Sequence, residues 1–238
     1  MCVVVHEGEV HLKVTEMFLS VQGEGLDTGR LCTFVRFTAC NIRCGYCDTD
    51  YSFYGGEEQT MDDVVSFVID QGAPTVCLTG GEPMLQKDLP VLMERLLAKG
   101  LSVVLETNGI IPLKAVPNAV TKVVDIKTPG ALRPASARDG FAESSRFRKT
   151  HFHYPNLETL NPHDQIKFVL CDREDYEWAC QFIETHRLTE KVQHVLLSPS
   201  HGELEPRHLV DWMTSDKVPA RLNLQVHKYI WGADVRGV

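Results

Sequence analysis

The feature that most constrains the fold of this chain is the regular alternation of short apolar runs with amphipathic ones. Runs rich in β-branched residues, such as residues 31–38 and 74–79, predict β-strands. Residues 61–72 and 89–100 have the spacing of amphipathic helices. The pattern continues with strands predicted at 13–21, 102–107, 121–126, 165–170, 194–198 and 221–225, and helices at 172–186 and 206–213.

Strands that are almost continuously apolar and are separated by helices indicate parallel β/α units with both sheet faces covered. About six such units are visible. A closed eightfold barrel needs about 250 residues, whereas this chain has 238 and contains an irregular stretch rich in Pro, Ser and Arg at about 128–164. We therefore predict an α/β fold, an open partial barrel of about six parallel strands, formed by a single domain over residues 1–238.

The irregular stretch at 128–164 is too long for a simple connection inside a compact domain. It is interpreted as a lid, an insertion or a dimer contact. Its charge and serine content are equally compatible with a partly disordered loop. The sequence leaves these alternatives open.

The composition limits the classes of partner. A formal net charge of −8 leaves no excess of positive charge to neutralise a phosphate backbone, which argues against a nucleic-acid partner and favours a small polar substrate. The first ten residues lack the apolar core of a secretory signal. Because no apolar run approaches the roughly 18 residues that span a bilayer, we expect a cytoplasmic protein with no membrane partner.

Three of the eight cysteines lie within eight residues, at the spacing C-x3-C-x2-C: Cys40, Cys44 and Cys47. A loop of this kind can fold around a metal ion or cluster, because metal binding lowers the pKa of the thiols and stabilises the thiolates. The other five cysteines stand singly; Cys77 and Cys180, for example, lie in apolar or helical contexts where cysteine packs as a small hydrophobic residue.

The number of thiols favours one type of metal centre. Structural zinc takes four protein ligands, usually as two pairs, and the sequence has no second C-x2-C pair, although His6 or His11 could complete such a site. A 4Fe-4S cluster takes one cysteine per iron, so three cysteines leave one iron open. The open iron can bind S-adenosylmethionine and pass an electron to it, which produces a carbon radical. A cluster that only transfers electrons remains an alternative.

Polar residues follow two predicted strands where those strands end. Glu106 and Asn108 close residues 102–107, while Asp125 and Lys127 close residues 121–126. Apolar strands that end in charged residues indicate a site at the carboxyl edge of a parallel sheet. An ion pair on the rim of the barrel is the alternative for Lys127.

The cysteine loop, with Tyr46 before its last cysteine, resembles the signature of the radical S-adenosylmethionine superfamily. The resemblance implies a partial β/α barrel, a 4Fe-4S cluster, S-adenosylmethionine and an external electron donor such as a flavodoxin or ferredoxin. It places Tyr46 near the adenine. Thr79-Gly80-Gly81-Glu82-Pro83 resembles the superfamily segment that receives the amino group of the cofactor, through Gly81 and Glu82. Asp125 and Lys127 resemble contacts to its ribose and carboxylate.

Further segments resemble the 7-carboxy-7-deazaguanine synthase family: residues 18–25, 34–36, 47–49 and 224–232, together with LTGGEPMLQ, ETNG and QIKFVL. The resemblance implies a homodimeric enzyme of queuosine biosynthesis that contracts the ring of 6-carboxy-5,6,7,8-tetrahydropterin and releases ammonia. In one place the sequence departs from the family pattern, because VVDIKTPG stands where many members have serine-proline-lysine. Lys127 retains the lysine.

The predicted substrate-binding residues are Val21, Gln22, Gly23, Glu24, Arg36 and Thr79. The amide of Gln22 suits the mixed donor and acceptor edge of a pterin. The guanidinium of Arg36 pairs bidentately with a carboxylate, which the substrate carries, although a salt bridge on the rim is a competing role.

The family resemblance also implies Mg²⁺, with Thr49 beside the last cysteine as its protein ligand and Asp48 and Asp50 assisting through water. Glu106 and His227 are predicted as proton donors or acceptors while the amine leaves. A glutamate that only orients and a packed structural histidine are the alternatives. Two rival functions stay open: an activase that installs a glycyl radical on a partner protein, and a non-catalytic iron-sulfur or zinc protein.

Overall fold

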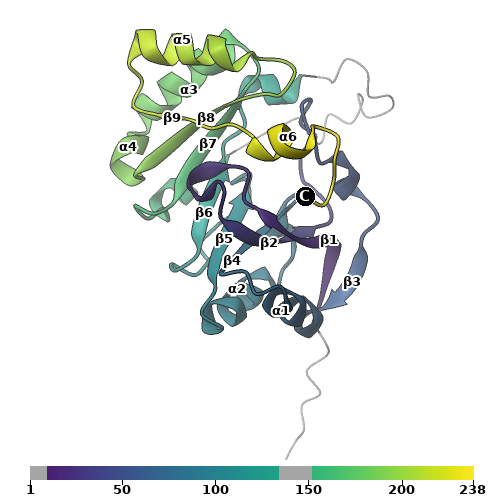
Figure 1. The fold of residues 1–238 in the computed structure, drawn as a ribbon. Helices are drawn as coiled ribbons and strands as arrows, with labels where there is room; N and C mark the ends of the chain where they lie inside the picture. Colours follow the sequence, from purple (N-terminus) through teal and green to yellow (C-terminus); the bar gives the residue numbers. More distant parts are fainter. Residues whose placement is uncertain (1–9, 134–151) are drawn as a thin grey trace, which may run out of the picture.

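A computed structural model describes residues 10–133 and 152–238, and within them it contains a sheet of nine strands in the order β3-β1-β2-β4-β5-β6-β7-β8-β9 (Figure 1). Strands β1 and β3 pair antiparallel at one edge. From β2 to β9 every neighbouring pair is parallel. The strands are β1 (His11–Val21), β2 (Leu31–Phe37), β3 (Glu57–Thr60), β4 (Thr75–Gly80), β5 (Ser102–Thr107), β6 (Thr121–Asp125), β7 (Gln165–Leu170), β8 (His194–Pro199) and β9 (Arg221–Leu222).

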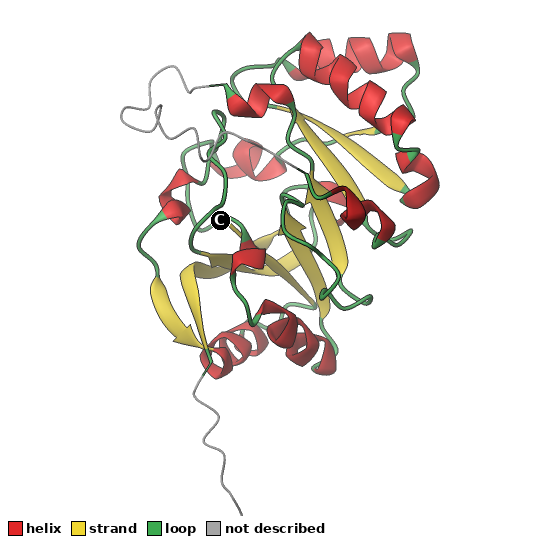
Figure 2. Cartoon of the chain, turned by 180° about the vertical axis from the view of Figure 1, so that it is seen from behind, coloured by secondary structure: helices red, strands yellow, loops and turns green. Residues whose placement is uncertain are grey.

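The helices α1 to α5 lie along the outside of the curved sheet, in two groups (Figures 1 and 2). Helices α1 and α2 lie by β4 and β5, and α3, α4 and α5 lie by β7 and β8. Helix α6 and the C-terminus lie across the other side of the sheet. The helices are α1 (Met61–Asp70), α2 (Leu89–Ala98), α3 (Arg173–Thr185), α4 (Leu188–Lys191), α5 (Pro206–Asp216) and α6 (Val226–Trp231). None of the described helices is both long and apolar enough to span a membrane.

The pleat of the parallel strands divides their side chains between two faces, because successive residues of a strand point to opposite sides. One set packs with the helices in the main core, including Val76, Leu78, Leu105, Ile166 and Phe168. The alternate residues form a second, smaller cluster on the opposite face, consisting of Cys32, Phe34, Cys77, Val104 and Val123. Positions two residues further along these strands are polar, so the inner face changes from apolar to polar toward the carboxyl ends of the strands.

The partial α/β barrel predicted from the sequence is confirmed, since β2 and β4 to β8 supply six parallel strands of full length. The last predicted strand, 221–225, is shorter than expected and ends at Leu222. The side chain of Asn223 explains the change of course, because Oδ1 accepts from Gly25 N at 2.7 Å and Nδ2 donates to Ser198 Oγ at 2.8 Å. Beyond Leu222 the chain is therefore held by these side-chain hydrogen bonds of Asn223 and no longer by strand pairing.

The described ends of the irregular stretch at 128–164 belong to the packed structure. Gly130 N donates to Asp175 Oδ1 on α3 at 2.8 Å, and Asn156, 1% exposed, donates to the carbonyl of Gly109 at 2.9 Å. Asp164 forms a buried ion pair with Lys122, Oδ2 to Nζ 2.8 Å. The remainder of the predicted insertion, residues 134–151, lies outside the described residues.

Candidate active site

A cavity of about 640 Å³ opens at the carboxyl ends of the parallel strands, where folds of this type bind their ligands. Residues from β1, the cysteine loop, six parallel strands (β2 and β4 to β8), α6 and the C-terminal segment line it. Every predicted site residue except Glu82 contributes to the lining: Val21, Gln22, Gly23, Glu24, Arg36, Cys40, Cys44, Tyr46, Cys47, Thr49, Thr79, Gly81, Glu106, Asp125, Lys127 and His227.

The cysteine loop is held mainly through its backbone. Gly45 N donates to the carbonyl of Ala131 at 2.9 Å, and Ala39 N donates to the carbonyl of Ser52 at 2.8 Å. Arg43 Nη1 donates to the carbonyls of Cys40 (2.9 Å) and Ile42 (2.8 Å), while its guanidinium lies 4.0 Å from the ring centroid of Phe53. Backbone anchoring leaves the thiols as the groups that face the cavity.

The donor set fits an iron-sulfur cluster. Burial raises the pKa of Cys40 and Cys44 to about 11 and that of Cys47 to about 12, so without metal these groups are neutral thiols. Within residues 10–133 and 152–238, no three His, Cys, Asp or Glu side chains are arranged around a single ion. A cubane requires no such convergence, because each thiolate binds a different iron.

The Gly80-Gly81 turn packs against the backbone that leads into the cysteine loop. Gly81 N donates to the carbonyl of Phe37 at 3.1 Å, and a Cβ on Gly81 would lie 2.0 Å from the carbonyl oxygen of Ala39. The side chain of Glu82 turns away from the cavity and is completely buried. Its carboxylate accepts from Thr107 Oγ1, Asn108 N and Met84 N. The cofactor contact predicted for Glu82 therefore has no support from its side chain, which instead joins the turn to the end of β5.

Tyr46, Asp125 and Lys127, the residues predicted to contact the cofactor, line the cavity together. Asp125 Oδ2 pairs with Lys127 Nζ at 2.8 Å, and this ammonium lies 5.5 Å from the ring centroid of Tyr46. Burial alone would lower the pKa of Lys127, but the attraction of the Asp125 carboxylate is stronger than the effect of burial, so the pKa is raised. Asp125 Oδ1 and the Tyr46 hydroxyl are buried without a hydrogen-bond partner in the described structure. These two polar atoms fit a ligand that carries hydroxyl and amine groups, such as S-adenosylmethionine.

Gln22, Thr79 and Glu106 contact one another in the cavity wall. Glu106 Oε1 accepts from Gln22 Nε2 at 3.3 Å, and Oε2 accepts from Thr79 Oγ1 at 2.9 Å. Gln22 Oε1 in turn accepts from Glu24 N at 3.1 Å. Nearby, the stacked rings of Phe18 and Phe34, with centroids 5.0 Å apart, supply an apolar part of the wall. The site therefore combines a flat apolar surface with directed polar groups.

Arg36 lies directly opposite Glu16 in the antiparallel pairing of β1 and β2. Its Nε donates to Glu16 Oε1 at 2.7 Å, and the same oxygen accepts from the Tyr51 hydroxyl at 2.7 Å. The ion pair considered as an alternative role for Arg36 is thus present. Because that pair uses Nε, it orients the guanidinium and leaves its terminal fork as the part suited to a ligand carboxylate.

Both carboxylate oxygens of Glu24 are engaged by residues from distant segments. Oε2 pairs with Lys167 Nζ of β7 at 2.9 Å, and Oε1 accepts from Gln225 Nε2 at 2.9 Å. Burial alone would raise the pKa of Glu24, but Lys167 and Gln225 lower it, so the carboxylate is ionised. Lys167 also lies 3.5 Å from Asp125 Oδ2.

Thr49, the predicted magnesium ligand, lies on the cavity wall beside Asp48. Its hydroxyl donates to Asp48 Oδ1 at 2.9 Å. Asp48 Oδ2 pairs with Lys228 Nζ at 2.6 Å and accepts from Gln225 at 3.2 Å. Desolvation raises the pKa of Asp48, but the nearby Lys228 ammonium prevails and lowers it below its usual value. Asp50 also lines the cavity.

His227 packs directly on Gly23. A Cβ on Gly23 would lie 2.2 Å from His227 Nδ1, so only glycine allows the imidazole to occupy this position. The neighbouring Val226 N donates to the carbonyl of Gly23 at 2.9 Å. Burial lowers the pKa of His227 below its usual value, which makes the neutral, proton-accepting form dominant at neutral pH.

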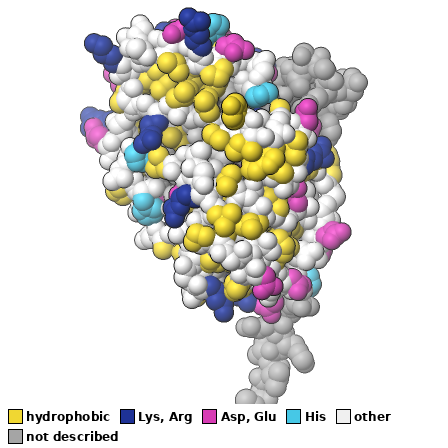
Figure 3. Space-filling model, in the orientation of Figure 1, with side chains coloured by type: hydrophobic (Ala, Val, Ile, Leu, Met, Phe, Trp, Pro, Cys, Tyr) yellow, Lys and Arg dark blue, Asp and Glu magenta, His cyan; other side chains and the backbone are white. Residues whose placement is uncertain are grey.

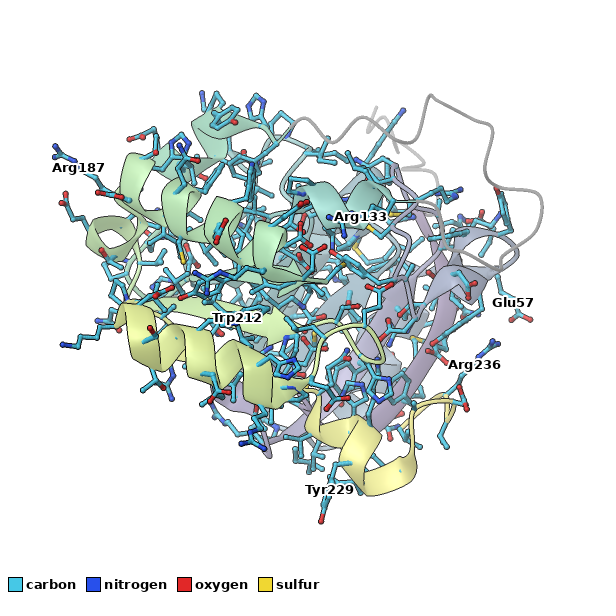
Figure 4. The ribbon with its side chains drawn as sticks, turned by 90° about the horizontal axis from the view of Figure 1, so that it is seen from above. Glu57, Arg133, Arg187, Trp212, Tyr229 and Arg236 are labelled. Atoms are coloured by element: carbon cyan, nitrogen blue, oxygen red, sulfur yellow. The ribbon has the colours of Figure 1, made fainter. Side chains whose placement is uncertain are left out.

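Several lining residues were not among those predicted from the sequence: Lys167, Gln225, Lys228, Ser198, Ser200, His201, Glu203 and residues 233–238. The sequence does contain an indication of Lys167, because it is a lysine within an otherwise apolar strand. The C-terminal segment reaches the cavity wall with Arg236, whose guanidinium lies 4.1 Å from the ring centroid of Tyr51 (Figure 4).

Comparisons with known proteins agree with this geometry. Residues 34–126 match the model of the Radical SAM superfamily. A crystal structure of QueE from Escherichia coli has the same fold, with a TM-score of 0.66 and 23% identity over 90% of this chain and 94% of that one. The fold, the three-thiol loop and the cavity beside it define a radical S-adenosylmethionine enzyme.

Two curated relatives show which family of radical S-adenosylmethionine enzymes the chain resembles. A 7-carboxy-7-deazaguanine synthase of Koribacter versatilis is 42% identical over 95% of this chain and 100% of the relative. One of Chlorobaculum tepidum is 36% identical over 97% of this chain and 99% of the relative. This chain belongs to the 7-carboxy-7-deazaguanine synthase family. Membership favours that enzyme class over the glycyl-radical activase and the non-catalytic metal protein.

The cluster ligands can be tested by single substitution to alanine. Cys40→Ala, Cys44→Ala and Cys47→Ala should each lose most of the bound iron after anaerobic reconstitution, because each removes the protein ligand of one iron. Cys32→Ala and Cys77→Ala are matched controls from the small inner core and should keep it. Iron and sulfide analysis with absorption spectroscopy makes the measurement; full iron content in the Cys44 variant would contradict the assignment.

Proposed function

We propose that this protein converts 6-carboxy-5,6,7,8-tetrahydropterin to 7-carboxy-7-deazaguanine and ammonia, as a step in queuosine biosynthesis. The observation that carries the proposal is the convergence of Gln22, Arg36 and Glu106 on the same cavity as the three thiols, in a chain that matches this family along almost its whole length. When bound to Cys40, Cys44 and Cys47, a 4Fe-4S cluster with S-adenosylmethionine supplies a carbon radical.

The residues beside the cysteine loop would hold the cofactor. Asp125 has one oxygen fixed by Lys127 and the other without a partner, which suits the hydroxyls of a ribose. Lys127 can pair with the cofactor carboxylate, and the ring of Tyr46 can pack near the adenine. The backbone of the Gly80-Gly81 turn is available to the amino group.

The opposite wall would bind the pterin. Arg36 pairs with the substrate carboxylate through its terminal nitrogens, while Gln22 and Glu106 face the donors and acceptors of the ring. Thr79 fixes one oxygen of Glu106, which leaves that carboxylate in a defined orientation. Neutral His227 can accept a proton while the amine leaves, and Glu106 is the second candidate for proton transfer.

An anaerobic assay tests the function directly. Reconstituted, reduced protein is given S-adenosylmethionine, Mg²⁺ and 6-carboxy-5,6,7,8-tetrahydropterin, and the products are separated by chromatography. We expect 7-carboxy-7-deazaguanine and ammonia in equal amounts. Formation of 5′-deoxyadenosine without turnover of the pterin would overturn the substrate assignment but not the enzyme class. Photoreduced flavodoxin and ferredoxin, tested in turn, identify the proposed electron donor.

Arg36→Ala should weaken binding of the tetrahydropterin about tenfold or more, because a charge-assisted hydrogen bond contributes about 1.5–3 kcal/mol. The affinity for S-adenosylmethionine should stay within about twofold. Arg30→Ala, which removes a largely exposed arginine paired with Asp27, is the control and should change neither. An equal loss of affinity for both ligands in Arg36→Ala would refute the role of Arg36 at the substrate carboxylate.

We also propose that Mg²⁺ enters the site with the substrate and contacts the hydroxyl of Thr49. One neutral protein ligand suffices when water and substrate oxygens supply the others. Thr49→Ala should raise the Mg²⁺ concentration that gives half-maximal product formation, whereas Thr49→Ser, which keeps the hydroxyl, should not. An unchanged magnesium dependence in Thr49→Ala would argue against this contact.

The protein is further proposed to form a homodimer. Apolar side chains gather on the face that carries α6 and β1 (Figure 3), and α6 exposes 92% of Tyr229 and 51% of Ile230. Tyr229 projects away from the ribbon (Figure 4). Apolar exposure of this kind is typical of protein interfaces. Sedimentation should give a dimer for the native protein and a monomer for Tyr229→Glu/Ile230→Glu; a native monomer would refute the proposal.

A further inference from the structure

Lys167 is a largely buried lysine at the centre of the cavity wall. It lies in β7, whose other inward-facing positions are Gln165 and Val169, while Ile166, Phe168 and Leu170 face the helices. Its side chain is 12% exposed. An ammonium is removed from water at considerable cost unless charged partners compensate it, so the partners of Lys167 indicate what this charge does.

The two carboxylates that contact Lys167 come from separate segments of the chain. Nζ lies 2.9 Å from Glu24 Oε2, on the loop after β1, and 3.5 Å from Asp125 Oδ2, at the end of β6. In the order of the sheet, β7 lies between β6 and β8 and is remote from β1. Lys167 is therefore the ammonium that joins the loop after β1, through Glu24, to the end of β6, through Asp125.

The network leaves one carboxylate oxygen of Asp125 for a ligand, whereas both oxygens of Glu24 are held by protein side chains. On Asp125, Oδ2 pairs with Lys127 and Lys167, while Oδ1 is buried and lacks a partner in the described structure. On Glu24, Oε2 pairs with Lys167 and Oε1 accepts from Gln225. Loss of the Lys167 ammonium would leave Glu24 without its cationic partner and Asp125 with Lys127 alone, so the charge that connects the two carboxylates would be gone.

We propose that Lys167 is a positioning residue that couples the binding of S-adenosylmethionine to the binding of the pterin by holding Asp125 and Glu24 in one charge network. The inference rests on the proposed function, which assigns Asp125 to the cofactor, and on the sequence-based prediction that Glu24 binds the substrate. Either ligand, by fixing its own carboxylate, fixes the ammonium between the two and so prepares the other carboxylate. The coupling is reciprocal, because linkage requires each ligand to change the affinity of the other by the same factor.

The charges around Lys167 agree with this role. Burial by itself would lower its pKa, but Glu24, Asp125 and Glu106 together outweigh burial and the nearby Lys127, so the pKa is raised and the group is an ammonium at all working pH values. Lys167 does not act as an acid or base in this arrangement. It acts as a fixed positive charge shared by two carboxylates.

The experiment measures binding by the reconstituted holoenzyme under anaerobic conditions. The Kd of S-adenosylmethionine is determined with and without saturating 6-carboxy-5,6,7,8-tetrahydropterin, and the Kd of the pterin with and without S-adenosylmethionine. In the native enzyme each ligand should tighten the other by the same factor, about fivefold or more. In Lys167→Met the factor should fall to about one, and Lys167→Arg should restore part of it.

Lys122→Met is the matched control. Lys122 is also a buried lysine paired with an aspartate, Asp164 Oδ2 at 2.8 Å, but it lies at the start of the neighbouring strand β6, away from the cavity lining. This variant should lower the thermal midpoint of unfolding and leave the coupling factor unchanged. If Lys167→Met does not fold, Lys167→Gln, which removes the charge and keeps a donor, takes its place.

The possible results separate the positioning role of Lys167 from a general structural effect and from a failure of the proposed function. A native coupling factor in a folded Lys167→Met or Lys167→Gln overturns the positioning role, and so does an equal loss of coupling in Lys122→Met, which would indicate a general structural effect. Absence of coupling in the native enzyme also overturns it. Failure of the native holoenzyme to bind the tetrahydropterin overturns the proposed function itself, and is recognised before any variant is compared.

Discussion

The pleat of the parallel strands is the constraint on which the rest of the structure depends. Residues that alternate along each strand are divided between the helix-covered core and the inner face. On the inner face a small apolar layer, with Phe34, Cys77 and Val104, is followed two residues later by Arg36, Thr79 and Glu106. The same geometry that excludes water from the barrel floor therefore brings the polar groups of the site together at its mouth.

Buried charge is the second organising feature. Lys127, Asp125, Lys167 and Glu24, in this order, form a chain of charges of alternating sign in the cavity wall. Such a chain is less costly to bury than its separate members, because each charge is compensated by the next. It also fixes rotamers, so the carboxylates face a ligand in defined orientations before any ligand binds, which reduces the ordering that binding requires.

Much of this arrangement could be predicted from the sequence, and the limits have physical causes. Apolar runs and helical spacing predicted the parallel β/α units, and the glycine turn and cysteine loop predicted where the site lies. Periodicity alone does not give the direction of pairing, so the antiparallel edge formed by β1 and β3 was not anticipated. Lys167 could have been noticed, because a lysine amid the apolar residues of a strand needs a buried partner. Its partners could not be identified, since Glu24 is 143 residues away in the sequence.

The contacts of the C-terminal helix α6 also join residues that are far apart in the sequence and could not be predicted from it. Lys228 and Gln225 contact Asp48 and Glu24 across 180 and 201 residues of sequence, respectively. Asp48 directly follows Cys47 of the cysteine loop, and Glu24 lies in the loop after β1. Helix α6 and Gln225, which precedes it, therefore join these two loops through side chains and through the bond from Val226 N to the carbonyl of Gly23, while the cysteine loop is held mainly through its backbone. Because no residue of α6 is buried and segments with few buried contacts open locally at lower free energy, substrate access is expected at the α6 side, with the cysteine loop remaining fixed.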